Sequence, residues 1–336
     1  DLHKEYRRQR QMCIRDSSER GFGTILVVDN TQDIEFKLVD YDYINELDAD
    51  SKLYKLLNRL FAQKPQPQQV AVFGKANGVT ADIVRELLSS GRTDWFWLVT
   101  TDNSLDTVKA LSEIAQTNSK IYAVTLNKYE DCEALFEEVY ENTFVDFHDD
   151  EFAFSAEATA VIMSYNVGGK TAKFKEVKGV KRANVSDTQI HDLHSNGINT
   201  YVEKLGVLQR SEGLVLSGEY LDIILGEYWI RFRMEERVLR ASVTNDKIPY
   251  TNIGIGILVG EVEGTLQDAV TQGIISSGQY RVDFKRREEV HSNDVALRKY
   301  DYIVWTAQLQ GAIHQGQISG ILTYDMVNEI EEKVGR

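Results

Sequence analysis

The sequence predicts an α/β N-terminal domain with a mostly parallel sheet, followed by an α+β C-terminal domain of two helices plus antiparallel strands. Between about residues 21 and 150, short apolar segments alternate with amphipathic segments of helical period, which is typical of strands joined by helical crossovers. Beyond about residue 205, two long helical segments come first and strand candidates follow. The length of 336 residues suits two domains of about 150 residues each.

The first strand and helix of the N-terminal domain show this pattern well. "GTILVVD" (23–29) is a short apolar run that ends in an aspartate, which predicts a strand. "DSKLYKLLNRLFAQ" (50–63) has leucines at helical spacing, and the prolines of "QKPQPQ" end the helix. By the same criteria we expect strands at 69–74, 94–101, 120–126 and 144–149, and helices at 80–91, 104–118, 129–143, 155–168 and 186–206.

The C-terminal domain begins with a strand-like segment at 207–218 and then a long helix from about Glu219 to Val243, with Leu221, Leu225 and Phe232 roughly along one face. A second helix is predicted at 252–273. Strand candidates follow at 280–286, 299–310 and 316–324. We therefore divide the chain into a leader (1–17), an α/β domain (18–204), an α+β domain (205–325) and a tail (326–336).

The leader is expected to be an artefact. "QMCIRDS" (11–17) resembles a translated sequencing adapter, and the segment lacks the apolar centre of a signal peptide. Without Cys13, Cys132 is the only cysteine, which excludes an intrachain disulfide and fits a reducing compartment. Cys132 lies among carboxylates in "YEDCEALFEEVYE", and these would raise its pKa, so we expect a buried small residue rather than a nucleophile.

Composition excludes two classes of partner. The formal net charge is −14, and a protein this acidic is not expected to bind nucleic acid along its surface, because lysine and arginine dominate phosphate binding. The chain also lacks an apolar run of the ~20 residues that a membrane helix needs. Hydrophobic residues make up 42% of the chain, enough for a substantial core.

The segment "KIPYTNIGIGILVGEVEG" (247–264) raises the question of a cofactor loop. Gly254 and Gly256 fit the first two positions of a dinucleotide fingerprint, but Val259 occupies the third. Three glycines four residues apart fall instead on one helix face, and each costs about 1 kcal/mol relative to alanine. We therefore predict a packing stripe of Gly256, Gly260 and Gly264, against which another helix or strand lies.

The remaining motifs do not complete an active site. "NVGGKTAKF" contains Gly169-Lys170-Thr171, the end of a phosphate-binding loop, but Ser164 occupies the position of the required first glycine. His191 and His194 have a spacing that can hold a metal, yet no third ligand is evident. His314 is expected in a turn between two strands. The sequence thus predicts no catalytic residues, no cofactor and no metal site.

The C-terminal domain resembles that of contractile phage tail sheath proteins, in particular a divergent branch of that family. The resemblance is carried by the long helix after Gly218 to Asp222, the segment Ile248 to Thr251 before the small-residue helix, and "GAIH" at 311–314. "GFGTILVV" (21–28) and "LFAQKPQPQQVAVFGK" (60–75) are also similar to that branch. The similarity extends over nearly all of residues 19–324.

This resemblance implies a structural subunit that polymerises around a tail tube and switches between extended and contracted packings. Terminal arms of such proteins add strands to sheets of neighbouring subunits. "QISGILTY" (317–324), with Ile318 and Leu322, is the candidate inter-subunit strand. The implied partners are further copies of the chain, a tail tube protein, and baseplate and tail terminator proteins. The implied location is the virion tail, assembled in the cytoplasm of the bacterial host.

Two alternatives stay open at this point. One is a nucleotide-utilising α/β enzyme, suggested by "GGKT" (168–171) and by the alternation of strands and helices. The other is a tail or baseplate component that shares the C-terminal domain but does not contract.

Overall fold

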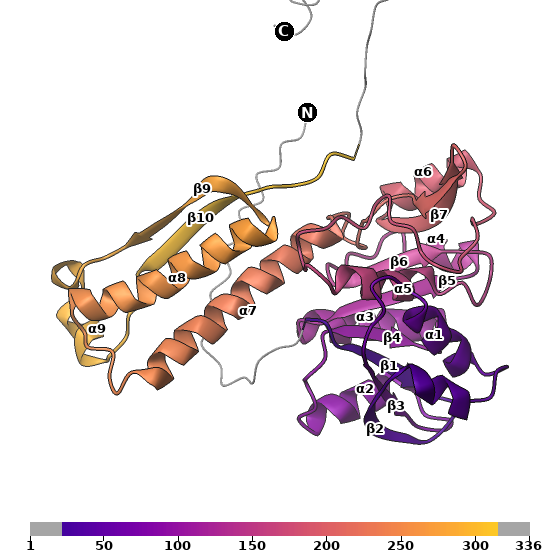
Figure 1. Ribbon diagram of the computed structural model, residues 1–336, viewed down its shortest axis with the longest axis horizontal. Coiled ribbons are helices and arrows are strands. Elements are labelled where there is room, and N and C mark those ends of the chain that lie inside the picture. The colour runs from indigo at the N-terminus through magenta and orange to yellow at the C-terminus, as the bar shows by residue number, and fades with distance from the viewer. Residues whose placement is uncertain (1–21, 315–336) are drawn as a thin grey trace, which may run out of the picture.

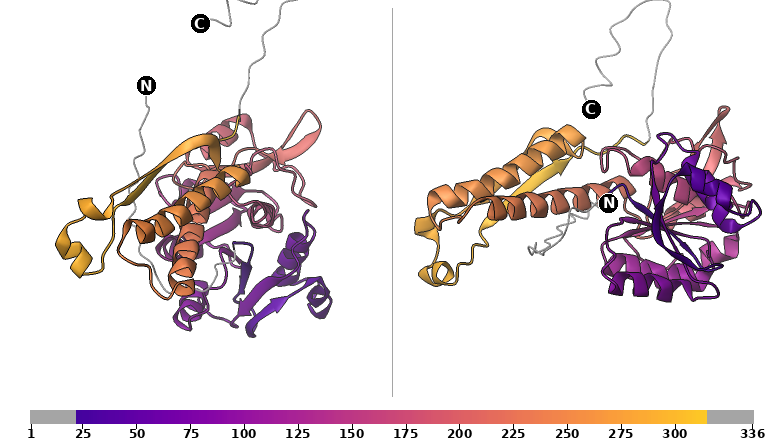
Figure 2. Two further views of the ribbon diagram at one scale, coloured as in Figure 1. Left: turned by 60° about the vertical axis from the view of Figure 1, so that its left-hand side comes forward. Right: turned by 60° about the horizontal axis from the view of Figure 1, so that its bottom comes forward.

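The computed structural model describes residues 22–314, which form two parts joined by one long helix (Figure 1). A compact body contains an eight-stranded sheet covered by helices. An elongated arm of two long helices and a two-stranded sheet extends from one side of the body (Figure 2). The predicted fold class is confirmed. The leader (1–17) and the candidate inter-subunit strand with Ile318 and Leu322 lie outside the described residues.

The sheet of the body is mostly parallel. Its strand order is β2-β3-β1-β4-β5-β6-β7-β8, in which the strands from β3 to β7 run parallel and the two edge strands are antiparallel to their neighbours. Such a sheet needs cover on both faces, and β1, β4, β5 and β6 are accordingly buried throughout. The strands are β1 (Ile25–Asp29), β2 (Ile34–Val39), β3 (Val70–Gly74), β4 (Trp97–Thr100), β5 (Ile121–Leu126), β6 (Thr143–Phe147), β7 (Ile198–Lys204) and β8 (Val207–Arg210).

Two hydrophobic cores lie on the two faces of this sheet. On one face pack α1 (Lys52–Phe61), α5 (Ser155–Met163) and the first half of α7 (Leu221–Thr244). The other face is covered by α2 (Thr80–Ser89), α3 (Leu105–Thr117), α4 (Tyr129–Glu133) and α6 (Asp187–Ser195). A 3₁₀ turn at Tyr41–Glu46 precedes α1, whose N-cap Ser51 accepts the Tyr54 N–H.

Three elements of the body differ from the sequence prediction. Strand β2 had not been predicted. Residues 198–204, expected to be helical, form β7, because Gly197 adopts a φ of 73° that ends α6. The helix expected at 129–143 ends at Glu133, and the like charges of Glu133, Glu137 and Glu141, spaced four apart, disfavour its continuation.

The arm consists of α7, α8 (Asn252–Gln272), β9 (Ile275–Phe284) and β10 (Ile303–Leu309). Thr251 caps α8 by accepting the Gly254 N–H, and Gly273 ends it with a φ of 86°. The second half of α7, α8 and the inner face of the hairpin share a third core, centred on Met234 and Leu266. A 3₁₀ turn (Arg287–Glu289) and α9 (Ser292–Ala296) connect the two strands.

The division between the parts lies at α7. Strand β8 carries the body sheet past residue 204, where the sequence analysis ended the first domain. Leu225 and Phe232 of α7 belong to the core of the body, whereas Ile230 and Met234 belong to the core of the arm. Among residues 22–314, no helix is both long and apolar enough to cross a membrane.

Glu157 of α5 gives the body a pH-dependent stability. Its side chain is fully buried and accepts the backbone N–H of Thr125 at 2.9 Å and the Thr125 hydroxyl at 2.5 Å. Burial is the largest effect and raises the pKa of Glu157 to about 7. The pKa of an unfolded glutamate is about 4.3. Between this pH and about pH 7, the folded state therefore binds one proton more than the unfolded state. Its contribution is therefore fully present below about pH 4.3 and is lost as the pH rises through 7.

We expect Glu157→Gln, a neutral isostere, to remove this dependence. The free energy of unfolding of the variant minus that of the wild type should rise between about pH 4.5 and 7, with a limiting slope of about 1.4 kcal/mol per pH unit, and level off above. Urea unfolding at a series of pH values measures the difference. If the free energies of unfolding of the two proteins changed with pH in parallel, the raised pKa of Glu157 would be contradicted.

Candidate assembly surfaces

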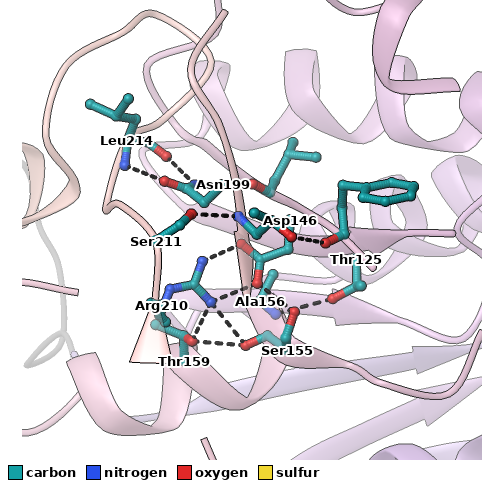
Figure 3. Close-up of polar contacts among 12 residues, drawn as sticks. Thr125, Asp146, Ser155, Ala156, Thr159, Asn199, Arg210, Ser211 and Leu214 are labelled. Carbon is teal, nitrogen blue, oxygen red and sulfur yellow. Dashed lines mark hydrogen bonds and ion pairs between the residues drawn. The ribbon is translucent and has the colours of Figure 1, made fainter. Parts of the chain in front are cut away.

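The most concentrated group of polar side chains in the body is internal. Arg210 of β8 forms a buried ion pair with Asp146 of β6, and its Nη1 also donates to the Thr159 hydroxyl at 2.8 Å (Figure 3). Ser155 donates to Asp146 Oδ2 at 2.5 Å. The side chains of Asp146 and Arg210 are fully buried, so a solute cannot reach them. The group joins β8 to β6 and α5, and it serves the fold.

Removing one partner of this pair should destabilise the body strongly. Arg210→Met leaves the Asp146 carboxylate buried without its cation, and we expect a loss of about 3–5 kcal/mol in the free energy of unfolding. The double variant Arg210→Met/Asp146→Leu buries no charge and should lose much less than the sum of the single changes. Urea unfolding of all four proteins tests this, and additive losses would rule out the coupling.

The histidines and the cysteine singled out from sequence do not meet. His194 Nε2 lies 2.8 Å from the Ser211 hydroxyl, and burial lowers the pKa of His194. Within residues 22–314, groups of three or more histidine, cysteine, aspartate or glutamate side chains suited to a metal are not found. Cys132 is buried in the core under α3, α4 and α6, and burial raises the pKa of its thiol, as expected of a small core residue.

The glycines of "GGKT" are required by packing at the junction of body and arm. A Cβ on Gly168 would lie 2.6 Å from Gly226 Cα of α7, and one on Gly169 would lie 2.1 Å from the Gln272 carbonyl oxygen at the end of α8. Gly168 also has a φ of 74°. Gly226 in turn lies against Ile274, where a Cβ would be 2.8 Å from Cγ2. These contacts account for the glycine pair without a phosphate ligand.

Alanine substitutions should have opposite effects on stability at the junction and on the exposed face of α8. Gly168→Ala brings backbone atoms into conflict in a left-handed conformation, so we expect a loss of about 2 kcal/mol or more in the free energy of unfolding. Gly256→Ala is the matched control, because its Cβ meets nothing within 4 Å. The control should gain about 1 kcal/mol from helix propensity. Thermal or urea unfolding of the monomer measures both changes. If the two alanine variants changed the free energy of unfolding equally, this account of the junction would be contradicted.

Two of the three glycines of the predicted packing stripe on α8 have no neighbour within residues 22–314, because added Cβ atoms on Gly256 and Gly260 would meet nothing within 4 Å. The third, Gly264, lies against the side chain of Arg237 of α7, where an added Cβ would be 2.9 Å from Nη1. Ile253, one turn before Gly256, is 79% exposed. The close approach of a neighbour to this face stays a prediction, and the neighbour would have to come from outside residues 22–314.

The hairpin of the arm has one half-buried face. Strands β9 and β10 pair antiparallel, with Trp305 opposite Val282 and Ala307 opposite Tyr280, and these side chains pack toward α8. In the sheet formed by residues 22–314, β9 and β10 pair only with each other, so each has an outer edge of unpaired backbone groups. Val304 is 58% exposed on the outer face. Such edges accept additional strands.

His314 follows β10 in an irregular segment, and the second strand that the prediction of a turn requires (316–324) lies outside the described residues. The chain leaves β10 and returns to the body, where His314 Nδ1 lies 2.7 Å from Glu212 Oε1 and Nε2 lies 2.8 Å from the Thr171 hydroxyl. Lys173 Nζ is 2.5 Å from the other Glu212 oxygen, and the Tyr220 ring packs edge-on against His314 at 4.8 Å. These contacts could not be seen in the sequence, because their partners lie about 100 to 140 positions earlier.

A cavity of about 230 Å³ lies where this returning segment crosses the junction. Burial raises the pKa of Asp222 and lowers that of Lys170, the two titratable residues in its wall. The lining residues are Gly168–Thr171, Asp222, Ile223, Gly273, Ile274 and Leu309–Ala312.

Comparison with known proteins agrees with the resemblance seen in the sequence. Residues 221–286, which contain α7, α8 and β9, match the family described as "E217 tail sheath protein gp31-like, C-terminal domain". The resemblance to contractile tail sheath proteins is thereby confirmed for this part of the chain. Curated protein sequences gave no significant match.

Solved structures share the fold over nearly the whole chain. A chain of the anti-feeding prophage (AFP) baseplate has a TM-score of 0.65 and 11% identity, and the match covers 97% of this chain and 99% of that one. A chain of the contracted sheath complex of the extracellular contractile injection system PVC has a TM-score of 0.65 and 12% identity, with 97% of both chains covered. At these identities the likeness concerns the fold.

Proposed function

We propose that this protein is a structural subunit of a contractile phage tail sheath, which polymerises around a tail tube and switches between extended and contracted packings. The observation that carries the proposal is the family match at residues 221–286, because it falls on the helices and strand that build the arm. The shared fold with sheath and baseplate proteins of contractile injection systems supports it across the rest of the chain.

The arm supplies the means of association. Its hairpin packs one face on α8 and leaves the outer edges of β9 and β10 unpaired within residues 22–314. Strands from neighbouring copies would extend this sheet by backbone hydrogen bonds, which give affinity without demanding a particular side-chain sequence. Segment 317–324 is our candidate donor strand, and Gly256 and Gly260 are our candidates for close contact with a second copy.

The continuity of α7 suits a subunit that moves as a rigid unit. Contraction by rigid-body rotation needs subunits that keep their shape while the contacts between them change. Leu225 and Met234 place one unbroken helix in the cores of both parts, and the glycine junction fixes the arm to the body at its base. The flexible connections then lie between subunits.

We further propose that the protein has no catalytic activity and acts in the tail of the virion, assembled in the cytoplasm of the bacterial host. Two observations support the absence of catalytic activity. The buried pair of Asp146 and Arg210 is closed to solutes. The close packing around Gly168 accounts for the glycines that had suggested a nucleotide site. The proposed partners are copies of this chain, the tail tube protein, and baseplate and tail terminator proteins.

Hydrogen exchange tests the association through the hairpin. In concentrated full-length protein we expect tubular or sleeve-like particles by negative-stain electron microscopy. Amides on the outer edges of β9 and β10 should exchange quickly in the monomer and become protected at least tenfold in the particles, because they acquire backbone acceptors. Amides of the buried strand β5 are the internal control and should not change. Particles whose hairpin edges stay unprotected would exclude strand addition there.

A further inference from the structure

Negative charge is concentrated over α4 and the turn that follows it. Residues 130–141 contain six acidic side chains and neither lysine nor arginine. Cys132 and Leu135 anchor this segment in the core under α2, α3 and α6, so the segment covers that face of the body sheet. One of its carboxylates, that of Glu138, is paired with Lys109 of α3 at 2.8 Å. We call residues 130–141 the acidic surface.

The exposed carboxylates in the middle of the acidic surface are not neutralised by the chain itself. Glu133 and Glu137 are exposed, and neither forms an ion pair within residues 22–314. Asp192 of α6 adds a further negative charge on the same side, since burial and then the carboxylates of Asp192 and Glu133 raise the pKa of the Tyr129 hydroxyl. The negative potential therefore extends from α4 to α6.

Positive charge is concentrated on segment 170–182, which lies over the other face of the sheet. This segment contains six basic residues and one acidic residue. Val177 and Val180 pack against α5, and the Val177 N–H donates to the Tyr201 hydroxyl of β7 at 2.9 Å. At the far end of the segment, the Ala183 N–H donates to the Tyr201 carbonyl oxygen at 2.8 Å. The segment is thus held against β7 and α5, and we call residues 170–182 the basic surface.

Part of the positive charge of the basic surface is balanced within the chain. Its internal ion pairs, each at 2.5 Å, are Lys173 with Glu212 and Lys178 with Glu176. Lys181 and Arg182 are exposed, and neither forms an ion pair within residues 22–314. Asp149 accepts the Asn184 N–H at 2.8 Å, so one negative charge lies near these two positive ones. An excess of positive charge remains on this side of the body.

The two surfaces lie on opposite faces of one sheet, so they do not neutralise each other within a chain. Charges are screened beyond about 8 Å at physiological salt, and one helix layer alone is about 10 Å thick. Between two copies in the same orientation, however, the acidic surface of one copy faces the basic surface of the next. A contact of this kind is heterologous, and its repetition generates open helical filaments.

The net charge of −14 selects this orientation of the copies. Two copies that meet in a random orientation repel each other, because each carries an excess of negative charge. At contact distance the local charges decide, so an acidic surface repels another acidic surface and attracts the basic one. Like-charge repulsion thus rejects the wrong orientations, while every copy carries the complement that the right orientation needs.

We propose that the acidic surface of one copy binds the basic surface of the next copy, and that this contact sets the register between neighbouring subunits. The inference rests on the proposed function and adds a contact between bodies to the strand addition between arms. Exposed ion pairs are individually weak, so we assign this contact mainly to orientation and the hairpin edges mainly to affinity.

Charge reversal tests the pairing. Glu133→Lys/Glu137→Lys places positive charges in the acidic surface, and Lys181→Glu/Arg182→Glu places negative charges in the basic surface. Each variant alone brings like charges together at the contact, so its critical concentration for particle formation should rise at least about tenfold. In an equimolar mixture the reversed surfaces meet each other and the unchanged surfaces meet each other. The critical concentration should then return to within about threefold of the wild-type value.

The matched control is Glu35→Lys/Glu46→Lys, which reverses two exposed carboxylates on β2 and the 3₁₀ turn. It changes the net charge as much as the acidic-surface variant does, and its critical concentration should not rise. All variants should keep the thermal midpoint of the wild-type monomer, because the replaced side chains are exposed.

A carbodiimide, which joins lysine to carboxylate without a spacer, identifies the contact directly. In particles of mixed isotope-labelled and unlabelled wild-type chains, we expect a crosslink between Lys181 of one copy and residues 130–141 of another. If wild-type particles form but a reversed variant assembles as well as wild type, or the mixture does not recover, the contact is wrong and the proposed function stands. If neither the wild-type protein nor the mixture forms particles, both fail together.

Discussion

Helix α7 takes part in two hydrophobic cores, and the arrangement of the whole molecule depends on this. A single helix has only a limited apolar surface, and along most of its length α7 is buried or half-buried on every side. Leu221 and Phe232 are committed to the body, while Ile230 and Met234 are committed to the arm. Because the helix cannot bend without opening one core or the other, body and arm hold a fixed relation.

The glycine junction makes that relation possible at close range. Gly168 lies directly against the backbone of α7 at Gly226, and Gly169 lies against the last turn of α8. Side chains at these positions would push the arm away from the body and open the third core near Ile274. A motif that resembles a phosphate loop in sequence is thus explained by three backbone segments that approach one another without side chains between them.

Elements with strong periodicity were predictable, and those defined by distant partners were not. The leucines of α1 and the long runs of α7 and α8 show their helices directly. Strand β7 contains Asn199 and Thr200, which read as polar helix residues, yet both are buried because the Asn199 amide donates to the carbonyls of Val145 and Leu214 and the Thr200 hydroxyl donates to that of Phe147.

The fixation of His314 bears on how mechanical load would pass through the subunit. The Gln310 N–H donates to the Ile274 carbonyl at 2.9 Å, and four residues later His314 is bonded to Thr171 and paired with Glu212 on the body. Tension applied to the chain beyond residue 314 is therefore taken up first by these body contacts. The backbone hydrogen bonds between β9 and β10 are then not the first to carry the load. A pull exerted through the chain would therefore move the subunit as a whole.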